Sequence, residues 1–222
     1  MQGTDRILVV GGLSGIGAGV VAAFPGRCTV WSRRSGVDAM DDAAVVAAGA
    51  ALLREQGVPY AWVHCVGDFA EHPLLDSDLA HYRHLLDSNL TSAFLVARAL
   101  VPAMVAARRG RVVWFAAAGA GDATAKARAP LYFAAKAALL SMARSLALEV
   151  AGSGVTVNVI SPGVIRHPTS HGPSQERMTP RVPAGRAGGV DDVVGAVRYL
   201  LSEAAAYVTG TELTVDGGLA LR

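Results

Sequence analysis

Tyr132 and Lys136 lie four residues apart, a spacing that places both side chains on one face of a helix. A nearby ammonium group stabilises a phenolate, so we expect Lys136 to lower the pKa of Tyr132. A phenol with a lowered pKa can donate and accept protons near neutral pH, as a general acid or base does. Because the same spacing also arises by chance on helix surfaces, its meaning depends on the rest of the chain.

A glycine-rich turn near the start of the chain indicates what this pair could act beside. Arg6–Val10 is apolar without alternation and predicts a buried strand, whereas the apolar run Gly15–Phe24 predicts a helix. Glycines in such a turn let the backbone approach a pyrophosphate, and the start of the helix supplies unpaired N–H groups. The spacing differs from Gly-x-Gly-x-x-Gly, so it is the flanking strand and helix that favour phosphate binding over a plain structural turn. The residues expected to contact the phosphates are Gly11, Ser14, Gly15, Ile16 and Gly17.

The pair and the turn, together with motifs elsewhere, resemble the short-chain dehydrogenase/reductase family over nearly the whole chain. Tyr132 and Lys136 are similar to the catalytic pair of that family, and the glycine turn is similar to its cofactor turn. Further similar segments are Asp38 (an adenine contact), His64–Gly67 (usually Asn-Asn-Ala-Gly), Asn89, Asn158–Gly163 (next to the nicotinamide) and Tyr207–Gly218. The resemblance implies that the cofactor is also contacted by Asp38, Cys65, Val66, Gly67, Tyr132, Lys136, Pro162, Gly163 and Ile165.

The same resemblance implies a role for each catalytic residue. Lys136 would hold the ribose hydroxyls and acidify Tyr132, and Tyr132 would give its proton to the carbonyl oxygen as hydride reaches the carbon. Asn89 would support a water that leads from Lys136 to solvent. The implied activity is that of a ketoreductase with a small or medium carbonyl or alcohol substrate.

The end of the second predicted strand indicates which nicotinamide cofactor is used. An NAD enzyme carries an acid there for the ribose 2′-hydroxyl, whereas an arginine accommodates a 2′-phosphate. This chain has Ser32, Arg33 and Arg34 at that point, and no acid before Asp38. A planar guanidinium group suits a phosphate, so NADP(H) is favoured over NAD(H). The alternative is that both arginines are only solvated surface residues.

One residue of the family pattern is missing. The family has a serine after its fifth strand that hydrogen-bonds the substrate carbonyl, but this chain has alanine at positions 116, 117 and 118. Loss of one oxyanion donor typically costs roughly 10²–10³ in rate. Three explanations stay open: Thr124 takes the role, the substrate assists itself, or the protein has left redox chemistry. The alternative function is therefore a cofactor-binding protein with lost or non-redox activity, such as a lyase, an isomerase or a partner subunit.

Strands and helices alternate along the chain, which predicts an α/β fold of the Rossmann type in one domain over residues 1–222. We expect a doubly wound parallel sheet of 6–7 strands with helices on both faces. Only five residues separate Ser32 from Asp38, so the family's helix between its second and third strands is missing and the third strand is at best vestigial. Pro102 predicts a kink or break in its helix. Expected strands are Arg6–Val10, Cys28–Ser32, Tyr60–Cys65, Arg111–Phe115, Val155–Ile160 and Glu212–Val215, and expected helices are Gly15–Phe24, Asp41–Gln56, Asp78–Ala107, Pro130–Ala151 and Val190–Ser202.

Composition and charge argue against several other classes of protein. Hydrophobic residues make up 52% of the chain and charged residues 17%, as in a folded globular protein. A net charge of +2 gives no electrostatic case for binding nucleic acid. Charged residues interrupt the apolar runs before the roughly 18 residues that cross a membrane, and no signal peptide is expected. Cys28 and Cys65 form no metal or disulfide pattern, so we expect no metal site and two buried free thiols in a cytoplasmic protein.

The segment Arg166–Gly189 is rich in Pro, Gly, Ser and charge, which predicts a flexible loop. The resemblance implies that this segment covers the substrate, with His167 where the family often has a threonine that contacts the nicotinamide. The resemblance also implies that the helices Asp78–Ala107 and Pro130–Ala151 are the faces through which a homodimer or homotetramer forms.

Overall fold

A parallel six-stranded sheet forms the centre of the protein in the computed structural model, which describes residues 5–122, 124–168, 170 and 172–221. The strands follow the order β2-β1-β3-β4-β5-β8, and each neighbouring pair is parallel. They are β1 (Ile7–Val10), β2 (Cys28–Trp31), β3 (Ala61–His64), β4 (Gly110–Phe115), β5 (Val155–Pro162) and β8 (Glu212–Val215).

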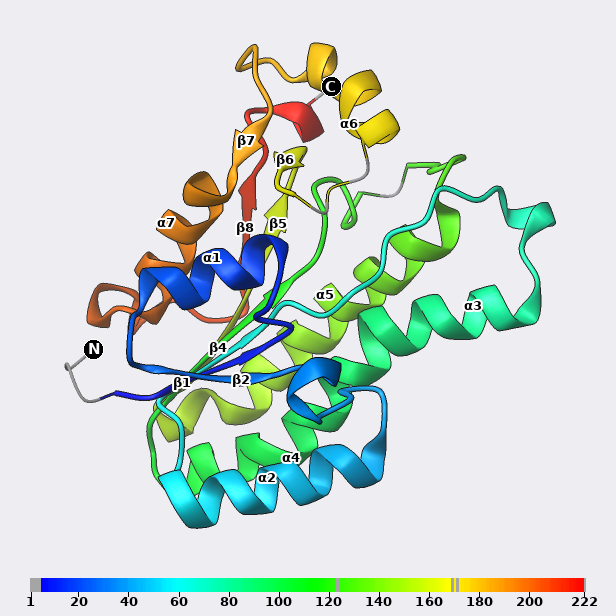
Figure 1. Ribbon diagram of the computed structural model, residues 1–222. Coiled ribbons are helices and arrows are strands. Elements are labelled where there is room, and N and C mark those ends of the chain that lie inside the picture. Colours follow the sequence, from blue (N-terminus) through cyan, green and yellow to red (C-terminus); the bar gives the residue numbers. More distant parts are fainter. Residues whose placement is uncertain (1–4, 123, 169, 171, 222) are drawn as a thin grey trace.

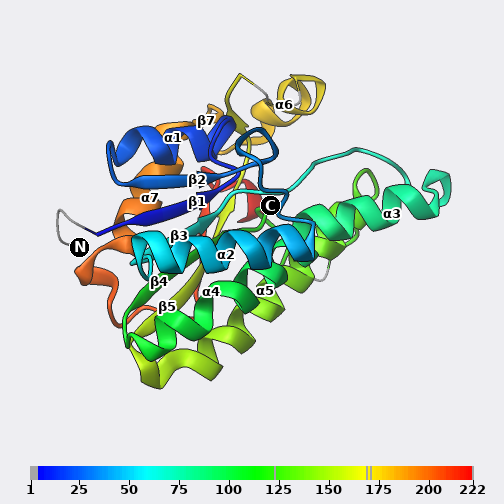
Figure 2. The ribbon, with the colours of Figure 1, turned by 60° about the horizontal axis from the view of Figure 1, so that its bottom comes forward.

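Helices cover both faces of this sheet (Figure 1). One face packs against α1 (Gly15–Ala23) and α7 (Val190–Leu201), through a core that includes Val9, Val63 and Val197. The other face packs against α2 (Asp42–Gln56), α4 (Ser92–Ala106) and α5 (Pro130–Val150), which lie side by side in Figure 2. The predicted Rossmann-type α/β fold is therefore confirmed. Because strands this short are buried on both faces, they are apolar without alternation, as the sequence showed.

The chain reverses its direction across the sheet between β1 and β3. β2 lies on one side of β1 and β3 on the other, with Val10 opposite both Trp31 and His64. In open parallel sheets, ligands bind outside the carboxyl ends of the strands at such a reversal. The glycine turn after Val10 therefore starts where a ligand-binding crevice is expected.

On the side of β2, the sheet has fewer strands than the family pattern, as predicted. The chain leaves β2 through a single 3-10 turn, Arg33–Ser35, and then enters α2. Among the described residues, no strand lies beyond β2. The Asp41 carboxylate caps α2 by accepting a hydrogen bond from the N–H of Ala44 at 3.1 Å.

The long helix predicted over Asp78–Ala107 is interrupted, but at a different position from the one expected. It consists of α3 (Leu79–Leu86), a π-helical turn (Asp87–Thr91) and α4, and α4 runs through Pro102 without a break. Proline removes one N–H donor, and the buried side chains on both sides of it, Leu100 and Met104, hold α4 in place. π-Helical turns occur frequently at functional sites, and this one contains Asn89.

The segment that was predicted as a flexible loop contains regular structure. Strands β6 (Ile165–Arg166) and β7 (Gly188–Gly189) pair with each other and close its base, and helix α6 (Gly172–Met178) lies between them in the chain. The loop prediction was wrong for these residues, because main-chain hydrogen bonds such as that from the Gly188 N–H to the Val164 carbonyl, at 2.9 Å, hold the base together.

Two helical segments, Leu79–Ala106 and Pro130–Ser153, are long and apolar enough to cross a membrane by length and composition alone. The expectation that charges exclude such segments was therefore wrong, because one or two charged residues hardly lower the mean hydropathy of a long window. Both segments pack against the sheet through buried residues such as Leu100 and Leu139. The core helices of a folded domain have the same composition.

Candidate active site

The glycine turn between β1 and α1 has a left-handed backbone at two positions, a conformation that favours glycine. Gly11 and Gly15 have φ values of 84° and 51°. A Cβ atom at Gly17 would lie 2.2 Å from the Gly11 carbonyl oxygen. Ser14 stands at the N-cap of α1 but its side chain makes no capping hydrogen bond. The N–H groups at the start of α1, including that of Ile16, therefore remain open to an anion.

The segment that follows β3 packs directly on this turn. The Cys65 N–H donates to the Val10 carbonyl at 2.7 Å, and a Cβ atom at Gly11 would lie 3.0 Å from the Cys65 carbonyl carbon and 3.1 Å from the Val66 nitrogen. Cys65 and Cys28 are both free and half-buried, and burial raises the pKa of the Cys65 thiol to about 12. Neither thiol is therefore reactive at neutral pH.

The basic residues after β2 lie at the open edge of the crevice. Arg33 and Arg34 are exposed and form no ion pair with another described residue. The hydroxyl of Ser32 accepts a hydrogen bond from the Ser35 N–H at 3.1 Å and so caps the turn. The Asp38 carboxylate accepts the Met40 N–H at 3.0 Å. Two guanidinium groups and the Asp38 carboxylate therefore stand along this part of the chain.

Tyr132 and Lys136 come from the first two turns of α5, where Pro130 occupies the first helical position. Lys136 is 4% exposed, and its Nζ donates to the Phe115 carbonyl at the end of β4, at 2.7 Å. Its Nζ lies 5.7 Å from the centre of the half-buried Tyr132 ring. The two side chains share a helix face, as their spacing predicted.

The pKa of the tyrosine differs from the expectation. Burial raises the pKa of Tyr132 to about 12 and lowers the pKa of Lys136 to about 8. The predicted lowering by the lysine was wrong for this structure, because the ammonium group is bonded to the Phe115 carbonyl and loss of solvent outweighs its effect on the phenol. Tyr132 is therefore protonated at neutral pH, which is the state required of a proton donor.

Asn89 joins this pair through the π-helical turn. Its Nδ2 donates to the Asp68 carbonyl at 2.9 Å and to the Leu85 carbonyl at 3.0 Å. Its Oδ1 is buried and has no hydrogen-bond partner among the described residues. A Cβ atom at Gly67 would lie 2.4 Å from that Oδ1 and 2.9 Å from the Lys136 Nζ. Only glycine at position 67 leaves a polar space between the amide and the ammonium group.

Comparison with known proteins agrees with this geometry. Residues 16–220 match the family model described as enoyl-(acyl carrier protein) reductase. The chain belongs to the short-chain dehydrogenase/reductase family. A solved structure, that of a putative short-chain dehydrogenase/reductase from Burkholderia xenovorans, is 28% identical and superposes with a TM-score of 0.89, covering 100% of this chain and 98% of that one.

Three curated relatives differ in how far they align with this family member. The 3-oxoacyl-[acyl-carrier-protein] reductase FabG of Escherichia coli is 36% identical over 146 residues, which cover 62% of this chain and 57% of FabG. The 3-oxoacyl-[acyl-carrier-protein] reductase MabA of Mycobacterium avium is 31% identical over 97% of this chain and 89% of MabA. The "Inactive 2-(S)-hydroxypropyl-CoM dehydrogenase 2" of Xanthobacter autotrophicus is 34% identical over 83% of each chain.

The region where the family carries its serine lies directly beyond β4. Ala116 and Ala117 are buried, and the Ala118 N–H donates to the Pro162 carbonyl at 2.9 Å, which continues the pairing with β5. No hydroxyl group is available on this stretch. Thr124, the nearest hydroxyl residue in the following loop, is exposed.

The remaining expected cofactor residues lie at the end of β5. The Gly163 N–H donates to the Val215 carbonyl at 3.0 Å, and a Cβ atom at Gly163 would lie 2.7 Å from the Asp216 Cβ. Ile165 points into the core beneath α7, so its side chain is a packing residue. His167 lies beside the glycine turn, because a Cβ atom at Gly15 would be 3.3 Å from the imidazole Nδ1.

His64, at the end of β3, is a structural residue. Its Nε2 lies 2.9 Å from the Ser92 Oγ, and that hydroxyl donates to the Ser88 carbonyl at 2.8 Å. The imidazole therefore donates to Ser92. Burial, with a smaller effect of the Lys136 charge, lowers the pKa of His64 to about 3 and keeps the ring neutral.

Phe69 is the residue near the phenol that the sequence analysis missed. Its ring lies edge-to-face with that of Tyr132, with 5.0 Å between the ring centres and 89° between the planes. Phe69 lies two residues after Gly67, in the loop that follows β3, and loops at the carboxyl ends of strands commonly carry functional residues. An aromatic residue two positions after Gly67, the glycine of the His64–Gly67 motif, was the available signal.

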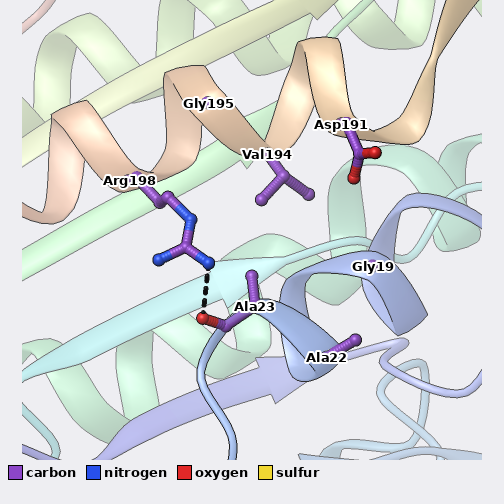
Figure 3. A pocket seen from close by; sticks show the side chains of 7 residues that line it. All are labelled: Gly19, Ala22, Ala23, Asp191, Val194, Gly195 and Arg198. Atoms are coloured by element: carbon purple, nitrogen blue, oxygen red, sulfur yellow. Dashed lines mark hydrogen bonds between the residues drawn. The ribbon is translucent and has the colours of Figure 1, made fainter.

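A surface hollow of about 390 Å³ lies away from this site, between α1 and α7 (Figure 3). Arg198 crosses it and donates to the Ala23 carbonyl at 2.8 Å. Gly19 is required there for close packing, because a Cβ atom would lie 2.1 Å from the Val190 Cγ1. The hollow is therefore part of the contact between two helices and contains no candidate catalytic residue.

Proposed function

We propose that this chain is an NADPH-dependent oxidoreductase that transfers hydride to the carbon of a small or medium carbonyl substrate, with Tyr132 as the proton donor. The observation that carries this proposal is the grouping of Tyr132, Lys136 and the open Oδ1 of Asn89 at the carboxyl ends of the strands, where the Lys136 Nζ is bonded to the end of β4. Membership of the family and its reductase relatives supports it.

The residues present fit a dinucleotide. The open N–H groups of the Gly11–Gly17 turn suit its pyrophosphate, and Cys65 and Val66 form the opposite wall. Pro162 and Gly163 end β5 on the same edge of the sheet. When bound, the reduced nicotinamide supplies the hydride, and the protein supplies orientation and the proton.

The proton path follows from the burial of the catalytic groups. Tyr132, protonated at neutral pH, donates its phenolic proton to the carbonyl oxygen as negative charge develops there. Lys136, with a pKa lowered to about 8, can pass a proton on without a large energetic penalty. A water held between Lys136 and the Asn89 Oδ1 would use the only acceptor on Asn89 that is unpaired among the described residues.

Two exposed arginines support NADP(H) rather than NAD(H). Arg33 and Arg34 stand directly after β2, where the ribose 2′ position of a dinucleotide on the glycine turn would lie. Neither guanidinium group is committed to a carboxylate among the described residues, so both are available for a 2′-phosphate. Asp38, which already accepts the Met40 N–H, would contact the adenine side.

The alanines at 116–118 support a second candidate, a cofactor-binding protein whose activity is lost or not redox. In that case the cofactor binds and no carbonyl compound is reduced. A protein that reduces carbonyls without the serine relies on the substrate itself or on Thr124, which would have to move in from an exposed position. A relative of comparable length bears the word "inactive" in its name, so this candidate has a parallel.

Self-association in the cytoplasm is part of the same proposal. Phe94 on α4 and Leu148 on α5 are 48% and 82% exposed, on helices that the family uses for dimers and tetramers. Burying such side chains against a second copy is favourable. Sedimentation of the wild type and of Leu148→Glu tests this surface.

Tyr132→Phe is the direct test of the mechanism. It removes only the hydroxyl, so NADPH binding is expected to stay unchanged while NADPH oxidation in the presence of a ketone falls by roughly 10²–10⁴. Tyr82→Phe, which removes the hydroxyl of a tyrosine on α3, is the matched control and should keep full activity. Undiminished turnover by Tyr132→Phe would remove the phenol from the mechanism.

A further inference from the structure

The loop that joins β3 to α3 starts at the catalytic groups and is fixed there. Its Asp68 carbonyl accepts the Nδ2 of Asn89 at 2.9 Å, and its Asp68 Oδ2 lies 2.8 Å from the His84 Nε2 on α3. Two bonds from different elements therefore define where the chain continues after Gly67. Phe69 is the next residue.

Phe69 places an aromatic ring beside the proton donor. Its ring centre lies 5.0 Å from that of Tyr132, and the residue is 39% exposed, so the ring is not fully covered by the protein. On the β4 side, the chain beyond Phe115 continues with the buried methyl groups of Ala116 and Ala117. An aromatic ring and methyl groups therefore lie near the phenol, together with the Lys136 ammonium group.

The same loop is tied to helix α6 by a partly shielded ion pair. Glu71 pairs with Arg177 of α6, and the Ser174 hydroxyl donates to the same Glu71 Oε1 at 3.1 Å. The side chains of Glu71 and Arg177 are 20% and 33% exposed, so the pair is less screened than an open surface pair. The Glu71 carboxylate is thus neutralised, and its ion pair links the Phe69 loop to α6.

We propose that Phe69 is a specificity-determining residue that selects carbonyl compounds with an aromatic group next to the C=O, and that Glu71 and Arg177 are positioning residues that hold the Phe69 loop against α6. This inference rests on the proposed function for the identity of the reacting group. Aromatic pairs gain from edge-to-face contact beyond the area that they bury.

Ligand binding, measured without turnover, tests the specificity half. Saturation-transfer NMR on the NADP⁺-loaded protein would compare phenylacetone, methyl heptyl ketone (the same number of carbon atoms, no ring) and acetoacetate (anionic). We expect phenylacetone to bind most tightly, and Phe69→Ala to weaken it by about tenfold with the NADP⁺ affinity unchanged. Tyr199→Ala, which removes a partly exposed ring on α7, is the matched control.

Hydrogen exchange tests the positioning half and does not depend on any substrate. Glu71→Gln and Arg177→Gln should each speed amide exchange in 172–178 and in 68–74, and the double reversal Glu71→Arg/Arg177→Glu should restore protection. Arg98→Gln, which breaks the exposed pair with Asp42, should leave both segments unchanged. Where turnover is measurable, the single variants should raise the KM for phenylacetone by about threefold with kcat nearly constant.

The outcomes separate this inference from the proposed function. Tightest binding of phenylacetone, lost in Phe69→Ala, with no NADPH oxidation, would support the inference and refute reductase activity. Equal binding of the three compounds, tightest binding of acetoacetate, or an unaffected Phe69→Ala variant would overturn the specificity half even if ketones are reduced. Unchanged exchange in Glu71→Gln and Arg177→Gln would overturn the positioning half.

Discussion

The two halves of the candidate site depend on different parts of the chain: one half depends on the main chain and the other on side chains. The cofactor half, at the ends of β1 and β3, depends on backbone: Gly11, Gly17 and Gly67 each stand where a Cβ atom would collide with main chain or with a catalytic side chain. The substrate half depends on side chains from loops, namely Phe69 after β3 and the alanines 116–118 after β4. The first half keeps the glycines of the family pattern, and the second has alanines where the resemblance implied a serine.

This difference indicates where function can vary in such a fold. A glycine that is required by a close approach of two backbones cannot be exchanged without moving both, so the cofactor half tolerates little change. A side chain at a loop position can be exchanged without moving the sheet, so the substrate half can change its chemistry while the fold persists. The following four predictions test the contrast, beginning with the largest effect.

Restoring a hydroxyl to the substrate half should have the largest effect. Serine introduced singly at Ala116, Ala117 and Ala118 should, at one of these positions, raise kcat/KM for a ketone by roughly 10²–10³, because an added donor stabilises the developing oxyanion. Ala120→Ser, also buried but further along the loop, is the control. If none of the three raises the rate, a donor supplied by Thr124 or by the substrate already fills this role.

A methyl group added to a glycine of the cofactor half should lower the affinity for NADPH strongly. Gly17→Ala forces a Cβ atom to 2.2 Å from the Gly11 carbonyl oxygen, so the turn must move. We expect NADPH affinity to fall by about 10²-fold, the loss that a displacement of about 1 Å can cause. Gly195→Ala on α7 meets no atom within 4 Å and should bind NADPH as the wild type does. Normal binding by Gly17→Ala, measured by fluorescence titration, would contradict the rigid turn.

The basic edge of the cofactor half should contribute a smaller, cofactor-specific effect. Arg33→Ala and Arg34→Ala each remove one charge-assisted contact to the 2′-phosphate, so we expect about a tenfold rise in the Kd for NADPH in at least one variant. The Kd for NADH should not change. Arg54→Ala, an exposed arginine on α2, controls for net charge. Equal losses for both cofactors would show that the arginines act on the fold or on long-range charge instead.

The buried lysine predicts a modest pH dependence of stability. Burial lowers the pKa of Lys136 from 10.5 to about 8, so between these values the unfolded chain holds a proton that the native protein has released. Stability therefore rises with pH in this window, by at most about 1.4 kcal/mol per pH unit, and this contribution is lost as the pH falls through about 8. Urea unfolding across the window should show the rise in wild type and not in Lys136→Met. If the free energy of unfolding changes with pH equally in the two proteins, the lysine is in a solvated environment.

Residues that act through backbone or spacing were predictable from the sequence. The spacing of four from Tyr132 to Lys136 fixes a shared helix face, and the glycines mark the turn, because in both cases local geometry decides the outcome. The loss of the family's third strand followed from a simple count of residues between Ser32 and Asp38. The doubly wound sheet followed from the alternation of apolar strands and helices.

Features that depend on contacts across the fold were not predictable. The π-helical turn at Asp87–Thr91 places the Nδ2 of Asn89 against the Asp68 carbonyl, a residue 21 positions away. The raised pKa of Tyr132 depends on burial, which the spacing of residues in the sequence does not predict. Helix α6 lies in a segment whose composition is that of a loop, and its Arg177 pairs with Glu71 across the site. Propensity is a weak guide wherever such tertiary contacts decide.

The central claim is that the cofactor half holds NADPH, and one titration tests it most directly. Trp62 and Trp114 lie in the core under the crevice, so energy transfer from tryptophan to bound reduced nicotinamide reports binding of either cofactor without a substrate. The account predicts saturable binding of NADPH with a Kd at least about tenfold below that for NADH. Tighter binding of NADH would contradict the role of Arg33 and Arg34, and no binding of either cofactor would contradict the claim itself.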